Sequence, residues 1–179
     1  MGTGEPLPLN PQQMQNVRAD INAEFENLQE AFQVTSWPTD AYNCIAWAAG
    51  DQYYWWWPDP DGEFYWPPGV DRVATVAAFI AAFQTLGYEP CDSPDLEPGF
   101  EKVAIYAVGD STKHMARQLS SGTWTSKLGE WWDIAHDSVD GVQDPPHRVH
   151  YGARRQIMRR RMLGPALIPT AAGNLVKPS

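Results

Sequence analysis

Three short segments in the second half of the chain constrain the fold more than any other feature. They cover residues 103–108, 114–119 and 123–128, and each has the composition of a β-strand. Turn-forming residues separate them, Gly-Asp after the first segment and Ser-Ser-Gly after the second. This pattern predicts an antiparallel meander in which the mostly apolar first strand is central.

In the third segment, successive side chains are expected on opposite faces, because the side chains of a strand have a period of two. Trp124, Ser126 and Leu128 fall on one face, and Thr125 and Lys127 fall on the other. A polar side chain on this strand can therefore orient a side chain of the adjacent strand, provided that both face the same way.

The first half of the chain has the periodicity of helices. Apolar residues recur at spacings of three and four from Pro11 to Phe32, which predicts an amphipathic helix. A second helix is expected after the capping residue Asp71, with its end marked by Gly87. One more strand is expected around residues 149–151. Helices followed by a meander predict an α+β fold.

A single domain is expected, because 179 residues suffice to bury one core. We assign it to residues 11–162, with loose tails at 1–10 and 163–179. The sequence has no apolar run of about 18 residues and no recognisable signal peptide at its start. These features predict a cytoplasmic protein without a membrane-spanning segment, and delivery into another cell is also compatible with them.

Charge and cysteine content exclude several classes of protein. A net charge of −9 argues against a nucleic-acid-binding protein, which needs a basic face. The basic run in residues 154–161 has two interpretations, an anion or RNA site, or a solvated face that offsets the acidic body. Two cysteines give neither a disulfide framework nor a zinc motif, so no metal or cofactor is expected.

Cys44 is the candidate nucleophile. It directly follows Asn43, a preferred N-cap residue, at the start of a short run compatible with a helix. The free N–H groups of a first helical turn favour a thiolate over a thiol, and we therefore expect Cys44 to alkylate faster than Cys91. The alternative is a small buried apolar residue, which is a common role for free cysteine.

His114 is the candidate base. It opens the second strand of the meander, and in a papain-like arrangement such an imidazole takes the proton of the cysteine thiol. We expect a ring nitrogen of His114 to lie within about 4 Å of the Cys44 sulfur. The group that orients the imidazole is Ser126 by position, whereas Asp133 and His136 are chemically better orienters that lie beyond the strand.

Residues 53–66 form a loop dense in aromatic residues and proline. Two interpretations stay open, an aromatic wall that contacts substrate through Trp55, Trp56 and Trp57, or a loop that covers the core with its own side chains. We expect Trp66 to be structural and at least one of the other three to be exposed near Cys44.

The order of a cysteine helix, an apolar strand, a histidine-led strand and a third strand resembles the NlpC/P60 branch of papain-like cysteine hydrolases. The segment 97–99, Glu-Pro-Gly, resembles the Pro-Gly-Asp lead-in of that family. His114 corresponds to its catalytic histidine and Ser126 to its third polar residue, which is usually His, Asn or Gln. The nucleophile segment departs from the pattern, with Asn-Cys-Ile-Ala in place of Asp-Cys-Ser-Gly.

A closer resemblance is to an uncharacterised family of small bacterial proteins. It rests on residues 42–48, 66–69 and 124–129 and extends over about residues 36–160. This second family implies no activity.

The resemblance to NlpC/P60 implies a papain-like fold, with N-terminal helices packed on the meander. It also implies a thiol hydrolase or acyltransferase that acts on an amide or ester bond of a peptide or small amide. Cys44 is then the nucleophile, His114 the base, and Asp133 or Ser126 the orienter. The alternatives are a non-catalytic binding or immunity-type module on the same fold, and a toxin domain delivered to other cells.

Overall fold

The computed structural model describes residues 8–162 of the chain. The expected tail at 163–179 lies outside the described residues, as do residues 1–7 of the expected tail at 1–10. The elements are α1 (Pro11–Glu24), η1 (Glu26–Leu28), β1 (Phe32–Ser36), α2 (Cys44–Ala49), α3 (Val76–Gln84), β2 (Glu89–Cys91), β3 (Phe100–Val108), β4 (Ser111–Gln118), β5 (Trp124–Lys127), β6 (Asp133–His136), η2 (Val139–Val142) and β7 (Ala153–Arg161).

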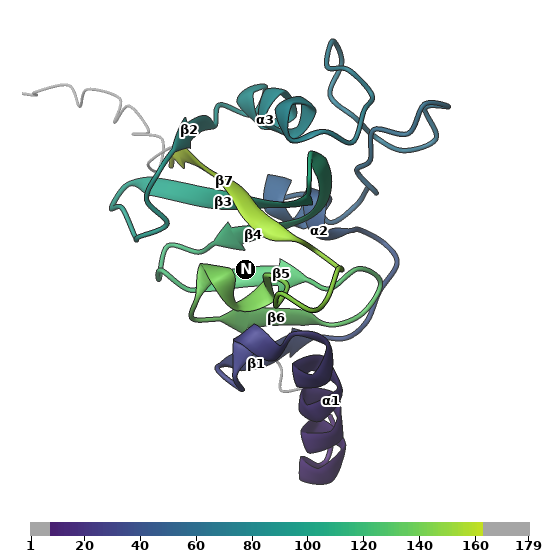
Figure 1. Cartoon of the computed structure of the whole chain (residues 1–179), viewed down its shortest axis with the longest axis vertical. Helices are drawn as coiled ribbons and strands as arrows, with labels where there is room; N and C mark the ends of the chain where they lie inside the picture. The colour runs from purple at the N-terminus through teal and green to yellow at the C-terminus, as the bar shows by residue number, and fades with distance from the viewer. Residues whose placement is uncertain (1–7, 163–179) are drawn as a thin grey trace, which may run out of the picture.

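The strands in residues 8–162 form one seven-stranded sheet in the order β1-β6-β5-β4-β3-β7-β2 (Figure 1). All neighbouring strands are antiparallel. Strands β3, β4 and β5 are successive neighbours, which confirms the predicted meander, and β3 lies inside the sheet. The predicted α+β class is therefore confirmed.

Helices α2 and α3 cover one face of the sheet, which we call the α2 face. Its core contains Cys44 and Ile45 of α2, Phe79 and Phe83 of α3, and inward-facing strand residues such as Met115. Helix α3 begins later than predicted because Thr75, rather than Asp71, is its N-cap. The Ala78 N–H donates to the Thr75 hydroxyl at 3.3 Å.

The opposite face, which we call the α1 face, is covered by α1, η1, η2 and the loop that precedes β7. Its core contains Tyr106 of β3, Ala116 of β4 and Trp124 of β5, packed with Ile21 of α1 and Tyr151 of the loop. Both faces of the sheet are therefore buried, and a strand residue contacts one core or the other according to its parity.

The N-terminal helix is shorter than predicted. It ends at Glu24, and the chain turns through Gln29 and Glu30, which both have positive φ values of 48° and 63°. Phe25 and Phe32 fit the helical spacing of the sequence, but both lie outside the helix. Both are buried, and Phe32 is the first residue of β1. Strand β1 pairs with β6, and neither strand was predicted.

The basic run lies in β7 and is largely paired with carboxylates. Arg154 Nε lies 2.7 Å from an Asp140 oxygen, and Arg159 Nη1 lies 2.8 Å from a Glu97 oxygen. Arg160 forms an ion pair with Glu101. The run therefore offsets nearby acidic groups, as the second of the two interpretations proposed. Within residues 8–162, no helix combines the length and apolar character needed to cross a bilayer.

Candidate functional site

Cys44 is the first residue of α2, as predicted from its position behind Asn43. The Asn43 side-chain oxygen accepts the Ala46 N–H at 3.0 Å, and its side-chain nitrogen donates to the Trp56 carbonyl at 2.7 Å. Helix α2 packs against β4 and β5, and Trp47 Nε1 donates to the Thr125 hydroxyl at 3.0 Å. The cap, the helix and the sheet thus fix the position of the cysteine.

The Cys44 sulfur is a protonated thiol at neutral pH, in contrast to the expected thiolate. Only 7% of the residue is exposed, and this burial raises the pKa of the thiol to about 11. Backbone N–H groups, first among them that of Met115, and the positive charge of Lys127 lower the pKa and offset part of the rise. Helix α2 has six residues, so its dipole contributes too little to overcome desolvation.

His114 is fully buried on β4 and belongs to a hydrogen-bonded chain of three side chains. Its Nε2 lies 3.1 Å from Ser126 Oγ, and Ser126 Oγ lies 3.0 Å from His136 Nε2. His136 Nδ1 lies 2.7 Å from the Ser138 carbonyl oxygen. The predicted pairing of His114 with Ser126 is therefore present, and His136 extends it from β6.

The chain of hydrogen bonds determines the tautomers of both histidines. The Ser138 carbonyl can only accept, so His136 donates through Nδ1 and, when neutral, accepts the Ser126 hydroxyl proton at Nε2. Ser126 Oγ then accepts from His114 Nε2–H, which leaves the His114 Nδ1 lone pair free. Within residues 8–162, this buried Nδ1 has no hydrogen-bond partner.

Burial keeps both imidazoles neutral. It lowers the pKa of His114 well below its ordinary value, and the neighbouring His136 and His150 lower it further. Burial likewise lowers the pKa of His136 to about 4. Tyr151 covers His114, with parallel rings 4.1 Å apart, and its backbone N–H donates to Asp144 Oδ1 at 2.9 Å.

The expected hydrogen bond between Cys44 and His114 is not formed between these two described residues. The reason is strand parity. Met115 faces the core that contains Cys44, whereas His114 contacts Tyr106 and Tyr151 of the α1 face. Cys44 is therefore part of the α2-face core, whereas the His114 ring packs against residues of the α1-face core.

Asp133 does not orient His114, in contrast to one of the expectations. It lies on the α2 face, where Oδ2 accepts the Tyr42 hydroxyl proton at 2.6 Å and Oδ1 lies 3.6 Å from Lys127 Nζ. Ser126 and His136 fill the role expected of an orienting group instead.

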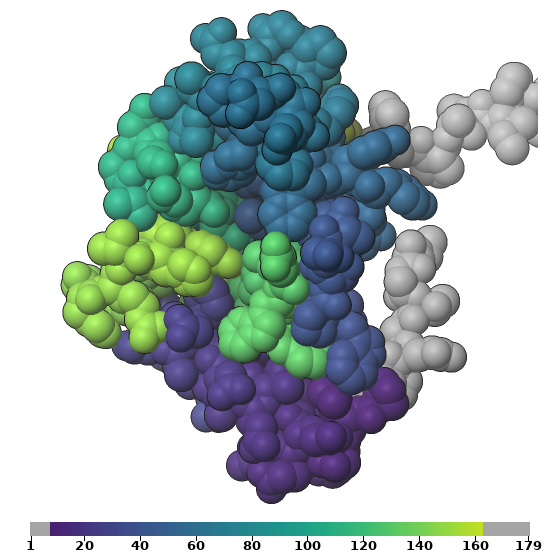
Figure 2. All heavy atoms as spheres, turned by 90° about the vertical axis from the view of Figure 1, so that its right-hand side faces the viewer, coloured from purple at the N-terminus to yellow at the C-terminus, as the bar shows by residue number. Residues whose placement is uncertain are grey.

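The expected exposure of at least one of Trp55, Trp56 and Trp57 is not found. Trp56 is buried and its Nε1 donates to Asp51 at 2.8 Å, while Trp55 and Trp57 are half-buried. Trp66 is buried, as expected. The exposed aromatic residues of loop 53–66 are Tyr53, Tyr54, Phe64 and Tyr65. Figure 1 shows this segment (blue) projecting from the body of the molecule, and Figure 2 views the molecule from that side.

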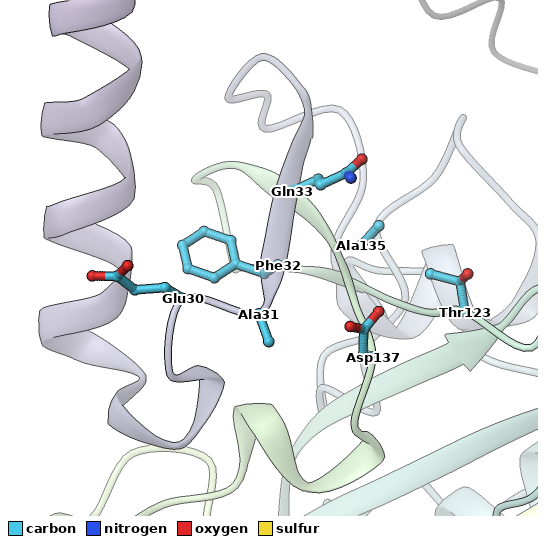
Figure 3. Close-up of a pocket in the computed structure, with 7 residues that line it drawn as sticks. All are labelled: Glu30, Ala31, Phe32, Gln33, Thr123, Ala135 and Asp137. Atoms are coloured by element: carbon cyan, nitrogen blue, oxygen red, sulfur yellow. The ribbon is translucent and has the colours of Figure 1, made fainter.

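A separate pocket of about 330 Å³ opens at the β1–β6 edge of the sheet (Figure 3). It is lined by Glu30, Ala31, Phe32, Gln33, Thr123, Ala135 and Asp137. This lining contains two carboxylates and no cysteine or histidine, so the pocket does not contribute to the thiol chemistry considered above. Among residues 8–162, no cluster of three or more His, Cys, Asp or Glu side chains could hold a metal ion.

Residues 33–159 match the family described as Domain of unknown function (DUF7689). The chain belongs to this family. The DUF7689 region extends from β1 into β7 and includes Cys44, His114, Ser126 and His136. The expected membership of an uncharacterised family is thereby confirmed. Neither a curated protein nor a solved structure matches the chain.

Two residues of the DUF7689 site were not identified from the sequence. Lys127 was placed on the correct face of its strand, but its complete burial was not foreseen. No pattern in the sequence indicated that both faces of the sheet are buried. Tyr151 was expected in a strand and lies instead in the loop before β7, where no local pattern indicates its stacking on His114.

Proposed function

We propose that this DUF7689 domain is a papain-like thiol hydrolase or acyltransferase, with Cys44 as nucleophile and His114 as base. The observation that carries the proposal is the His136–Ser126–His114 chain, which leaves the His114 Nδ1 lone pair free. A general base needs such a lone pair and needs its other ring nitrogen fixed by a partner.

The arrangement of the elements also supports a papain-like fold related to NlpC/P60 proteins. A capped helix carries the cysteine against an antiparallel sheet, and the histidine and its orienting serine lie on adjacent strands of that sheet. The order of these groups along the chain is the order in that family.

In the proposed reaction the Cys44 sulfur bonds to the carbonyl carbon of an amide or ester. The thiol proton passes to His114 Nδ1, and the imidazolium then protonates the amine or alkoxide that leaves. Water or another acceptor attacks the thioester and regenerates the thiol. The backbone N–H groups of Cys44 and Met115 are the candidate donors to the oxyanion, since both lie close to the sulfur.

The reaction requires a rearrangement, because Cys44 is 7% exposed and His114 is 0% exposed. The segment to move is the loop 144–152, whose Tyr151 covers the imidazole. The proposed reaction also requires β4 and β5, which pair at two positions only, to part far enough for the two catalytic groups to meet.

Acyl transfer from p-nitrophenyl acetate tests the proposal without knowledge of the natural substrate. We expect release of p-nitrophenolate and acetylation of Cys44, detected by mass spectrometry. His114→Gln should slow the acetylation about a hundredfold, the usual contribution of a general base. Cys91→Ser is the matched control and should keep the wild-type rate. Acetylation absent from Cys44, or unchanged in a folded His114→Gln variant, would refute the assigned roles.

A second function, binding of a partner by the aromatic loop, is supported by the exposure of Tyr53 and Tyr54, which are 87% and 63% exposed. The same loop exposes Asp61 and Glu63 and carries no basic residue between positions 51 and 66, which suits a basic partner. Titration with Lys- and Arg-containing peptides, followed by tryptophan fluorescence, tests this function. Binding that survives in a Tyr53→Ala, Tyr54→Ala double variant would contradict it.

A further inference from the structure

Lys127 is a fully buried lysine on the α2 face of the sheet. Its exposed fraction is 0%, although lysine is rarely buried completely without a functional or structural partner. Thr125, two residues earlier on β5, shares its face and accepts a hydrogen bond from Trp47 of α2. The fold therefore directs Lys127 toward the helix that begins with Cys44.

The surroundings of Lys127 neutralise its charge incompletely. Its Nζ donates to the Trp131 carbonyl at 2.5 Å and lies 3.6 Å from Asp133 Oδ1, which is too far for a hydrogen bond. Within the described part of the chain, this Oδ1 has no hydrogen-bond partner, while Oδ2 is used by Tyr42. A buried ammonium in so loose an ion pair can stabilise a second anion at low cost.

Tyr42 connects this cluster to the cysteine. Lys127 Nζ lies 5.7 Å from the centre of the Tyr42 ring, and Tyr42 precedes Cys44 by two residues. Tyr42 also stacks with Trp47 of α2, with the ring centres 6.2 Å apart. The ammonium, the tyrosine and the thiol thus lie together on one face of the sheet.

We propose that Lys127 is the cationic partner of Cys44 and stabilises its sulfur as a thiolate. The inference rests on the proposed role of Cys44 as nucleophile. Burial has the largest effect on both groups, since it raises the pKa of Cys44 and lowers the pKa of Lys127. Against burial, the charge of Lys127 lowers the pKa of Cys44, and Asp133 and then a Cys44 thiolate raise the pKa of Lys127. His114 cannot supply this charge at neutral pH, because burial on the other face keeps it neutral. Lys127 therefore supplies the positive charge, and His114 accepts the proton.

Alkylation of Cys44 by iodoacetamide, followed residue by residue with mass spectrometry, tests the inference. We expect Lys127→Met to slow alkylation at pH 8 about tenfold, because a unit rise of the thiol pKa reduces the thiolate fraction tenfold. Lys127→Arg keeps the charge, and a natively folded variant should keep the rate within about threefold of wild type. Unfolding would expose Cys44 and speed its alkylation, so a slower rate cannot arise from a damaged fold.

A matched control is available in the same chain. Lys102 is also a buried lysine, and its charge lowers the pKa of Cys91. Lys102→Met should slow alkylation of Cys91 and leave Cys44 unchanged. An unchanged or faster rate at Cys44 in a natively folded Lys127→Met variant would overturn the inference.

The wild-type protein gives a second measurement that needs no variant at this position. A nearby ammonium attracts anionic iodoacetate relative to neutral iodoacetamide, so the ratio of their rates at Cys44 should be higher in the folded protein than in urea. An equal or lower ratio in the folded protein would overturn the inference. Failure of acetyl transfer with a raised ratio would instead count against the hydrolase proposal alone.

Discussion

Acidification should destabilise this protein through His136, a buried neutral histidine. Its pKa is about 4 in the folded protein, against 6.5 for an unperturbed histidine. Between these values the unfolded chain binds a proton that the folded chain does not, so the free energy of unfolding falls as the pH falls from 6.5 to 4. For this one group the loss is about 2 kcal/mol at pH 5 and about 3 kcal/mol at pH 4.

Urea unfolding followed by tryptophan fluorescence at pH 7.5 and pH 5 measures this loss. Carboxylates also titrate in the range, so the informative quantity is the difference between wild type and His136→Gln, whose side chain does not titrate. The variant should lose about 2 kcal/mol less than wild type on acidification. His147→Gln is the control, because the His147 side chain is exposed and should give the wild-type loss. Equal losses in wild type and His136→Gln would refute the argument.

Three further outcomes are expected. Asn43→Ala should lower the free energy of unfolding, measured by urea titration, by about 2–3 kcal/mol, because it removes an N-cap and a buried hydrogen bond to Trp56. A loss below about 0.5 kcal/mol would contradict this expectation. Trp56→Ala should lower the free energy of unfolding by about 3–5 kcal/mol because Trp56 is buried, whereas Tyr53→Ala should change it by no more than about 0.5 kcal/mol because Tyr53 is exposed. Equal shifts of the melting temperature in the two variants would contradict this contrast. Brief iodoacetamide treatment at pH 7 should label the half-buried Cys91 before Cys44, the reverse of the order expected from the sequence. The reason is that burial raises the pKa of Cys44 more than the helix terminus lowers it. Preferential labelling of Cys44 would contradict that explanation.

The sequence predicted those parts of the fold that depend on local signals. Turn residues separated β3, β4 and β5, and alternation along residues 124–127 assigned the correct faces to Ser126 and Lys127. Strand β1 was missed because it is short and is stabilised by pairing with β6, about a hundred residues away. Strand β6 also pairs with the neighbouring β5, but it has only 4 residues and was missed for that reason. Phe32 illustrates the difficulty, since its spacing fits a helix and only the pairing with β6 makes it the start of a strand.

The candidate site was predictable in its members and only partly in its geometry. Cys44 at a helix start and His114 beside Ser126 follow from a cap signal and from strand alternation. The tautomer of His114 depends on His136, which β6 brings to Ser126, so it required the unpredicted strand. Long-range pairing and the burial of both sheet faces therefore account for what the sequence left open.

The short pairing of β4 with β5 divides the sheet into two mechanical blocks. Within the described chain, the ladder between these strands consists of Arg117 opposite Thr125 and Gln118 opposite Trp124. On one side lie β1, β5 and β6, and on the other lie β2, β3, β4 and β7. Helix α2 and the hydrogen bond between His114 and Ser126 bridge this seam. Shear along the seam would therefore strain the cysteine helix and the histidine chain together.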